Sequence, residues 1–209
     1  ITGIALVIGL FLGILLALLL DRLDNTFKTS QDVEARLGLP VLGVGQLIKE
    51  PGKIAPQRIF IDDNQSGFAE SIRTIRTAVM LSALDTPKKV LMVTSSVPEE
   101  GKTTIAINLA VALSHVKRVL LIDADMRRPS LGKSLGFAPD APGLSHFVAG
   151  TAAISKCIYP FEGTSLHVMP SGLIPPNPLE LLMSNRFKEV LTALSETFDY
   201  IVIDSAPVH

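Results

Sequence analysis

The chain has 209 residues, with 19 basic and 20 acidic side chains and a net charge of −1. This length allows one domain of ordinary size and an appendage, and the near balance of charge gives no indication of nucleic-acid binding. The single cysteine, Cys157, excludes an internal disulfide and agrees with a reducing compartment. The mean hydropathy of +0.41 is high for a soluble protein, and its cause is local.

The first 20 residues, ITGIALVIGLFLGILLALLL, contain no charged side chain. Twenty helical residues rise about 30 Å, the thickness of the hydrocarbon core of a bilayer, so residues 1–20 are predicted to form a transmembrane helix. A cleaved signal peptide and a buried core helix are the alternatives, but no basic n-region or small-residue cleavage site accompanies the run. Arg22, Lys28 and Arg36 follow it, which favours a cytoplasmic position for the rest of the chain. Because the chain starts at Ile1, we expect it to be a piece of a longer protein.

Residues 21–65 are predicted to be a juxtamembrane segment and linker. Ser30 is expected to cap a short helix that ends at Gly38, and residues 39–45, LPVLGVG, are expected to form a short strand. Residues 49–65 contain prolines, a glycine and the polar run DDNQ, which predicts a linker in which residues 59–61 dock locally.

The main domain is predicted to span residues 66–209 and to open with an amphipathic helix over residues 67–83. Its apolar positions recur at helical spacing, at Phe68, Ile72, Ile75 and Val79. Glu70, Arg73 and Arg76 fall on one flank of this helix, beside the apolar stripe. From the residues alone, a solvated face with a local Glu–Arg pair is the simplest interpretation.

A phosphate-binding loop is predicted between a strand at residues 90–95 and a helix that starts at Gly101. The connecting residues fit G-x-x-x-x-G-K-[ST] except that Ser96 replaces the first glycine. Lys102 would reach the β- and γ-phosphates and the Thr103 hydroxyl would bind Mg²⁺. A strand-to-helix turn that contains GKT by chance is the alternative. The predicted nucleotide-binding residues are Ser96, Pro98, Glu99, Glu100, Gly101, Lys102, Thr103, Thr104 and Arg127.

Two further strands, at residues 118–123 and 200–203, are each followed by acidic residues. In open α/β sheets the carboxyl ends of parallel strands share one edge, where ligands bind, so Asp123, Asp125 and Asp204 should meet Lys102 there. Each aspartate taken alone could be a turn or cap residue. A strand at residues 165–169 and a helix at 179–198 complete the prediction of an α/β fold, a P-loop NTPase-type parallel sheet flanked by helices.

The set of motifs resembles the membrane-anchored bacterial tyrosine autokinases of polysaccharide export, known as BY-kinases, the chain-length determinant or co-polymerase type. The motifs are SSVPEEGKTT as Walker A, LLIDADMRRP as Walker A′, IVIDSAP as Walker B, GLIPPNPLELL, and ESIRTIR as an E-x-x-R-x-x-R oligomerisation helix, after a transmembrane helix.

This resemblance implies a non-specific protein-tyrosine kinase that transfers the γ-phosphate of Mg-ATP to tyrosines in the tail of a neighbouring subunit. It implies a ring-like homo-oligomer built through Glu70, Arg73 and Arg76, at the bacterial inner membrane with the kinase domain in the cytoplasm. Partners would belong to the polysaccharide polymerisation and export machinery. The implied catalytic residues are Lys102, Asp123, Asp125 and Asp204, and the implied metal-binding residues are Thr103, Asp123 and Asp204.

The chain departs from the family pattern in stopping at His209, and its two tyrosines are Tyr159 and Tyr200. We therefore expect the domain to be truncated at its C-terminus and to lack its phosphoacceptors, which leaves activity of the piece in isolation in question. Two other functions stay open. One is a partitioning (MinD/ParA-like) P-loop ATPase, although Val97 stands where such enzymes carry a signature lysine. The other is a non-catalytic polysaccharide co-polymerase that uses nucleotide only for assembly.

Overall fold

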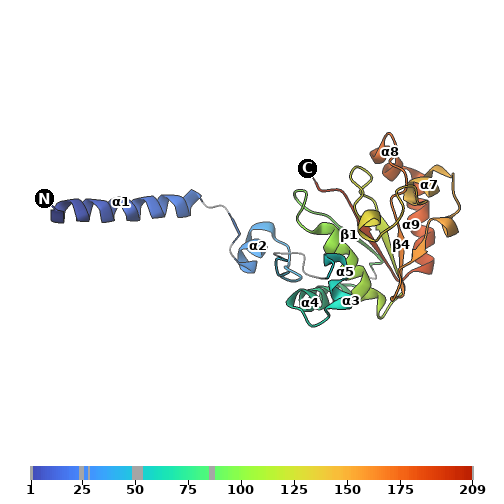
Figure 1. Cartoon of the computed structure of the whole chain (residues 1–209), viewed down its shortest axis with the longest axis horizontal. Coiled ribbons are helices and arrows are strands. Elements are labelled where there is room, and N and C mark those ends of the chain that lie inside the picture. Colours follow the sequence, from blue (N-terminus) through green and yellow to red (C-terminus); the bar gives the residue numbers. More distant parts are fainter. Residues whose placement is uncertain (1, 24–25, 28, 49–53, 85–87, 209) are drawn as a thin grey trace. The chain divides into compact units, whose positions relative to one another are not determined.

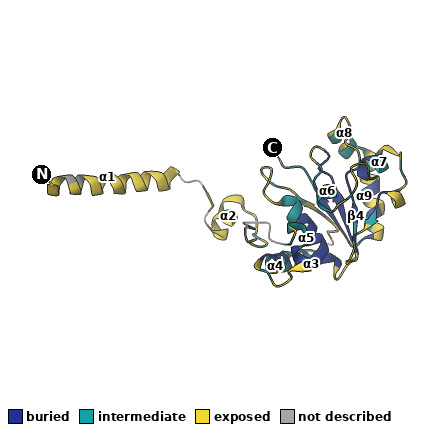
Figure 2. Cartoon of the chain, viewed as in Figure 1, coloured by how far each residue is buried: buried dark blue, intermediate teal, exposed yellow. Residues whose placement is uncertain are grey.

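The computed structural model describes every residue except 1, 24–25, 28, 49–53, 85–87 and 209 (Figure 1). It contains two compact units, Ile1–Val41 and Leu42–His209. In the first unit, α1 (Thr2–Leu23) is long and apolar enough to cross a membrane, and none of its most apolar stretch is buried. Figure 2 shows this helix as exposed wherever its burial is described. The expected helix is therefore present from Thr2, the first described residue, and extends to Leu23.

The second helix, α2 (Ser30–Leu37), has a different N-cap from the one predicted, because Thr29 and not Ser30 takes that position. The Thr29 hydroxyl accepts a hydrogen bond from the Asp32 N–H at 3.1 Å, and the Asp32 carboxylate accepts one from the Thr29 N–H at 3.1 Å. This reciprocal capping box satisfies two backbone donors, which a cap at Ser30 would not do. The helix ends at Gly38 as predicted.

One sheet of five strands organises the second unit, in the order β1-β5-β2-β4-β3. The strands are β1 (Val90–Val93), β2 (Val119–Asp123), β3 (Tyr159–Pro160), β4 (Leu166–Met169) and β5 (Tyr200–Asp204). All pairings are parallel except that of β3 with β4. Because β5 lies between β1 and β2, it pairs Asp204 directly with Asp123.

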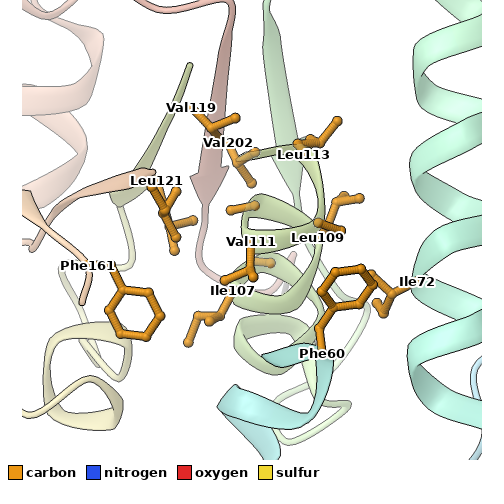
Figure 3. Packing of buried hydrophobic residues seen from close by; sticks show 14 of the residues in the cluster. Phe60, Ile72, Ile107, Leu109, Val111, Leu113, Val119, Leu121, Phe161 and Val202 are labelled. Carbon is orange, nitrogen blue, oxygen red and sulfur yellow. The ribbon is translucent and has the colours of Figure 1, made fainter. Parts of the chain in front are cut away.

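Helices cover both faces of this sheet. One face carries α4 (Gly67–Ser82), α5 (Lys102–Ser114), the 3₁₀ helix η1 (Pro56–Arg58) and α3 (Ile59–Asp62), and the other carries α7 (Leu144–Ala149) and α9 (Asn185–Thr197). The side chains of β2 alternate, so that Val119 and Leu121 pack toward α5 (Figure 3) while Leu120 and Ile122 pack toward α9. Since both faces are covered, β2 and β5 are buried along their whole length, as expected for inner parallel strands. The predicted α/β class is confirmed.

Two predicted elements are wrong. Residues 39–45 form no strand. Instead Gly43 and Val44 lie against α4, where the Ser71 hydroxyl donates to the Val44 carbonyl at 2.8 Å and a Cβ on Gly43 would lie 2.7 Å from Ile75. The lack of a side chain at Gly43 permits this close approach.

The helix expected over residues 179–198 is two helices, α8 (Pro178–Met183) and α9. Ser184 is extended (ψ 150°) and its hydroxyl accepts a hydrogen bond from the Phe187 N–H, so it ends the first helix and caps the second.

The predicted linker at residues 49–65 is largely structured where it is described. Residues 49–53 lie outside the described residues, but η1 and α3 occupy residues 56–62. Ile59 and Phe60 are buried in the same core as α5, which confirms the predicted docking of residues 59–61. A short helix α6 (Leu131–Ser134) and a second 3₁₀ helix, η2 (Ile154–Lys156), complete the described elements.

Candidate nucleotide-binding site

The loop between β1 and α5 holds two residues in the left-handed region. Gly101, the N-cap of α5, has φ 78°, and Glu99 has φ 67°. Glycine adopts this conformation freely, whereas a residue with a side chain costs about 1 kcal/mol or more there. Backbone strain of this kind is typical of ligand-binding turns. The turn delivers the chain to the N-terminus of α5, whose first N–H groups have no helical partner and can bind an anion.

Ser96 and Glu100 hold this loop together from within. The Glu100 carboxylate accepts hydrogen bonds from the Ser96 N–H at 2.9 Å, the Ser96 hydroxyl at 3.0 Å and the Val97 N–H at 3.3 Å. These bonds, from Val97 and then from Ser96, lower the pKa of Glu100. Ser96, at the position of the missing first glycine, therefore contributes a hydroxyl to the closure of the loop.

The polar centre of the site lies where α5 meets the end of β5. The Lys102 ammonium is paired with Asp204 Oδ1 and lies 4.0 Å from Asp125 Oδ2. The Thr103 hydroxyl lies 2.7 Å from Asp204 Oδ2 and 2.9 Å from the Ser130 hydroxyl. The fold thus confirms that Lys102, Asp125 and Asp204 meet at one edge of the sheet.

Burial raises the pKa of Asp204, against the opposing effect of Lys102 and Thr103. Asp123 is the most confined member of the group. It is fully buried, its Oδ1 accepts a hydrogen bond from the Asp125 N–H at 3.2 Å, and among the described residues its Oδ2 has no hydrogen-bond partner. Burial, and next the charge of Asp204, raise the pKa of Asp123 to about 7. An unpaired buried carboxylate oxygen is unfavourable for folding, so its presence beside Asp204 is a mark of a functional site.

These groups adjoin a pocket of about 650 Å³ at the carboxyl edge of the sheet. The predicted residues that line it are Pro98, Glu99, Gly101, Lys102, Thr103, Thr104, Asp125 and Arg127. Ser96, Glu100, Asp123 and Asp204 are not among the lining residues: Asp123 and Asp204 are fully buried, whereas Ser96 and Glu100 are exposed. Lining residues that sequence reasoning missed are Gln57, Ser95, Arg128, Ser130, Ser134, Ala206 and Pro207. Arg128 and Ser130 flank the proline of the RRPS run, which could have signalled them; Gln57 carries no local signal.

The lining fits a nucleoside triphosphate with a divalent cation. The volume lies within the roughly 300–1,000 Å³ of small-molecule sites, and Lys102, Arg127 and the start of α5 supply positive charge and N–H donors for phosphate. The Thr103 hydroxyl and the carboxylates of Asp125 and Asp204 are hard oxygen ligands of the type that Mg²⁺ prefers. Among the described residues no group of three or more His, Cys, Asp or Glu side chains could hold a metal by itself. Mg²⁺ would therefore need phosphate oxygens and water to complete its shell.

The three predicted oligomerisation residues on α4 make contacts within the chain. Arg73 Nη1 lies 2.5 Å from Glu70 Oε2, and the Arg73 guanidinium lies 5.6 Å from the centre of the Phe60 ring. Arg76 is half-buried, and its Nη1 donates to the carbonyl of Ala112, at the end of α5, at 3.4 Å. Its Nε has no hydrogen-bond partner in the part of the chain that the structure describes. The local Glu–Arg pair expected from the spacing is thus present, and Arg76 faces α5.

A parallel sheet with a phosphate-binding loop between β1 and α5, and acidic residues at the ends of β2 and β5, defines the P-loop NTPase class. Comparison with known proteins narrows this class. Residues 88–209 match the sequence model of the family described as "AAA domain". The chain is 35% identical to the tyrosine-protein kinase ptk of Acinetobacter johnsonii over 98% of its own length, and it spans 29% of the length of that kinase.

Solved structures give the same result. The BceF tyrosine kinase domain is 33% identical with a TM-score of 0.77, over 86% of this chain and 76% of that one. The kinase domain of the Escherichia coli tyrosine kinase ETK is 27% identical with a TM-score of 0.77, over 86% of this chain and 72% of that one. The chain belongs to the family of bacterial tyrosine-protein kinases, the BY-kinases.

Proposed function

We propose that this chain is the catalytic part of a membrane-anchored tyrosine kinase that transfers the γ-phosphate of Mg-ATP to tyrosine side chains. The observation that carries the proposal is that Lys102 and Asp125, which line one pocket of a BY-kinase fold, meet Asp204 at the end of β5. Because the chain spans under a third of the kinase ptk, the activity of the whole protein is part of the proposal.

Each polar group has a role that its position supports. Lys102 would exchange its carboxylate partner for phosphate oxygens and stabilise negative charge on the transferred group. Thr103 and Asp204 would hold Mg²⁺, with Asp123 behind them. Bound Mg²⁺ would neutralise charge on the phosphates. A base must also accept the tyrosine proton. Asp125 lines the pocket whereas Asp123 does not, so we assign this role to Asp125.

The acceptor tyrosine is proposed to come from outside the residues described here. Tyr200 is buried in β5, and the Tyr159 hydroxyl donates to the Pro142 carbonyl at 3.2 Å while its ring packs on Phe137. Burial, and next Cys157, raise the pKa of Tyr159, which makes its phenol harder to deprotonate for attack. We propose that a neighbouring subunit supplies the acceptor in its tail, with α4 contributing Glu70, Arg73 and Arg76 to the subunit contact.

The location and pathway are proposed from the same resemblance. With α1 in the inner membrane, the nucleotide pocket would face the cytoplasm, where ATP is available. The proposed process is polymerisation and export of an extracellular or capsular polysaccharide, controlled by phosphorylation of the oligomer.

The test is direct. The full chain in detergent is incubated with Mg-ATP labelled at the γ-phosphate and with a synthetic glutamate–tyrosine copolymer, and phosphotyrosine is measured on both. Label on tyrosine that requires Mg²⁺ is the expected result. A chain that binds Mg-ATP but labels no tyrosine on itself, on the copolymer or on a longer form of the protein would overturn the proposal.

A further inference from the structure

The segment of residues 56–62 is fastened to the phosphate-binding helix by one buried side chain. Asn108, in the middle of α5, is fully buried. Its Oδ1 accepts a hydrogen bond from the Phe60 N–H at 2.9 Å, and its Nδ2 donates to the carbonyl of Pro56 at 2.9 Å. The same Nδ2 donates to the Thr104 carbonyl at 2.8 Å, in the first turn of α5. The carboxamide of Asn108 therefore joins the start of η1, at Pro56, and the following α3, at Phe60, to α5, the helix whose N-terminus forms part of the phosphate site.

Two further side chains, Phe60 and Arg58, hold the same segment in place. The Phe60 ring packs between α5 and α4, beside Ile72 (Figure 3), and lies 5.5 Å from the ring of His115. Arg58 is paired with Asp62 at 2.8 Å, and its guanidinium lies 5.7 Å from the centre of the Phe161 ring. Residues 56–62 are thus packed into the domain, with Phe60 and Arg58 both in contact with other elements.

This attachment brings Gln57 into the wall of the nucleotide pocket. Gln57 follows Pro56, whose carbonyl is bonded to Asn108, and it lines the pocket together with Thr104. It lies outside residues 88–209, which match the AAA domain, so this part of the wall is an addition to the nucleotide-binding core. A carboxamide is a neutral group whose NH₂ can donate two hydrogen bonds. Beside the first turn of α5, the groups of a bound nucleotide that accept hydrogen bonds are its phosphates.

We propose that Gln57 is a nucleotide-binding residue that donates a hydrogen bond to a phosphate of the bound nucleotide, and that Asn108 is the positioning residue that holds it there. The proposal rests on the proposed function only in that the pocket takes Mg-ATP. A hydrogen bond from a neutral donor to a charged acceptor is worth enough to change affinity by about tenfold or more. Since Gln57 is not among the groups assigned to the chemistry, its loss should raise KM for ATP and leave kcat nearly unchanged.

The experiment measures binding of Mg-ATP to the full chain in detergent by isothermal titration calorimetry. Gln57→Ala should weaken binding about tenfold, and Gln57→Glu should weaken it further because a carboxylate repels phosphate. Gln65→Ala, an exposed glutamine just after α3, is the matched control and should bind as the parent does. Unchanged affinity in Gln57→Ala, or tighter binding by Gln57→Glu than by Gln57→Ala, would overturn the assignment.

The positioning role of Asn108 is tested by a double-mutant cycle. Asn108→Ala should weaken binding in the parent chain but add little in a Gln57→Ala background, whereas a merely structural role would lower affinity equally in both. If Asn108→Ala does not fold, Asn108→Asp replaces it in the same cycle. Failure of the parent chain to bind Mg-ATP would overturn both this inference and the proposed function. Binding that Lys102→Met weakens and Gln57→Ala does not would overturn this inference alone.

Discussion

The two edges of the parallel sheet both carry charged residues, but in opposite environments. At the carboxyl edge Asp123 and Asp204 are fully buried, and the side chain of Lys102 is 8% exposed. At the amino edge, where the chain enters the strands, an exposed basic group surrounds Asp199, and its members are Lys88, Lys89, Lys117 and Arg118.

The same residue type behaves in opposite ways at these edges. The pKa of Asp123 is raised to about 7, chiefly by burial, whereas the pKa of Asp199 is lowered, chiefly by the hydrogen bond from the Arg118 N–H and then by nearby basic charges. Burying a charge costs several kcal/mol, and exposed pairs contribute little. The buried charges at the carboxyl edge therefore lower the stability of the fold, as is typical of a functional site. The amino edge is an ordinary solvated surface.

The largest expected effect is on catalysis at the carboxyl edge. Lys102→Met removes the positive charge that faces the phosphates, so formation of phosphotyrosine should fall by about 10²–10³. An anti-phosphotyrosine blot measures it on the full-length protein, with membrane insertion expected to be intact. Lys117→Met, at the amino edge, is the matched control and should retain full signal. Equal signals from the two variants would erase the functional difference between the edges.

The next effect is on stability. Asp123 has a raised pKa in the folded state, so between its unfolded value of 3.8 and about 7 the folded chain keeps a proton that the unfolded chain releases. The free energy of unfolding therefore falls as pH rises through this window, and the loss is complete above it. Asp123→Asn removes this loss and should stabilise the chain at pH 8 by as much as about 4 kcal/mol, with little change at pH 4. Chemical denaturation of both forms at the two pH values measures the difference.

Asp199→Asn is the matched control, and its expected effect on the free energy of unfolding has the opposite sign. Its lowered pKa contributes stability above the unfolded value of 3.8 that is lost as pH falls through the folded value. Because its side chain is 40% exposed, the loss at neutral pH should be no more than about a few tenths of a kcal/mol. Similar shifts of the same sign in the two variants would contradict the account of the edges.

Substitutions on α4 are expected to have a smaller effect on the stability and ATP affinity of the monomer. The pair of Glu70 with Arg73 is exposed and worth about 0.5 kcal/mol, so Arg73→Ala with Arg76→Ala should change ATP affinity little. If α4 forms a subunit contact, the double variant should weaken oligomerisation and lower phosphorylation in trans. Light scattering on the full chain measures the mass, with Thr74→Ala, exposed on the same helix, as control. An unchanged mass would leave these side chains with only their contacts within the chain.

Much of this structure could be predicted from local sequence pattern. The strands at residues 118–123 and 200–203 and the helix from Gly101 are long apolar runs with clear ends, and their acids and Lys102 meet as the rule for parallel sheets requires. The pattern could not reveal that β5 lies between β1 and β2, because strand order depends on contacts far apart in the sequence. It failed at residues 39–45, where Leu42 and Val44 are exposed and the backbone at Gly43 and Val44 contacts α4 instead of another strand.

The site shows the same limit. Gln57 is held at the pocket because Asn108 forms hydrogen bonds with Pro56 and Phe60, which precede it by 52 and 48 residues in the chain. Asn108 lies inside an apolar helix, where a lone polar residue does not reveal its partner. The pattern also did not show that the helix over residues 179–198 is interrupted at Ser184. A serine within a helical pattern becomes an N-cap only where the backbone leaves the helical conformation, which the pattern does not reveal.

The central claim is that the carboxyl-edge pocket directs the γ-phosphate to tyrosine. The most direct measurement follows phosphate release and phosphotyrosine formation in the same sample of the full chain with Mg-ATP, with and without an added tyrosine-bearing peptide. A P-loop ATPase must hold a water in line with the γ-phosphate, whereas a kinase gains by excluding it until the acceptor docks; Val97 stands where a partitioning ATPase would carry its signature lysine. We predict slow phosphate release without peptide and rapid phosphotyrosine formation with it. Fast phosphate release without phosphotyrosine would instead support a partitioning ATPase, and neither product from a chain that binds Mg-ATP would support a nucleotide-dependent assembly factor; either result would contradict the account.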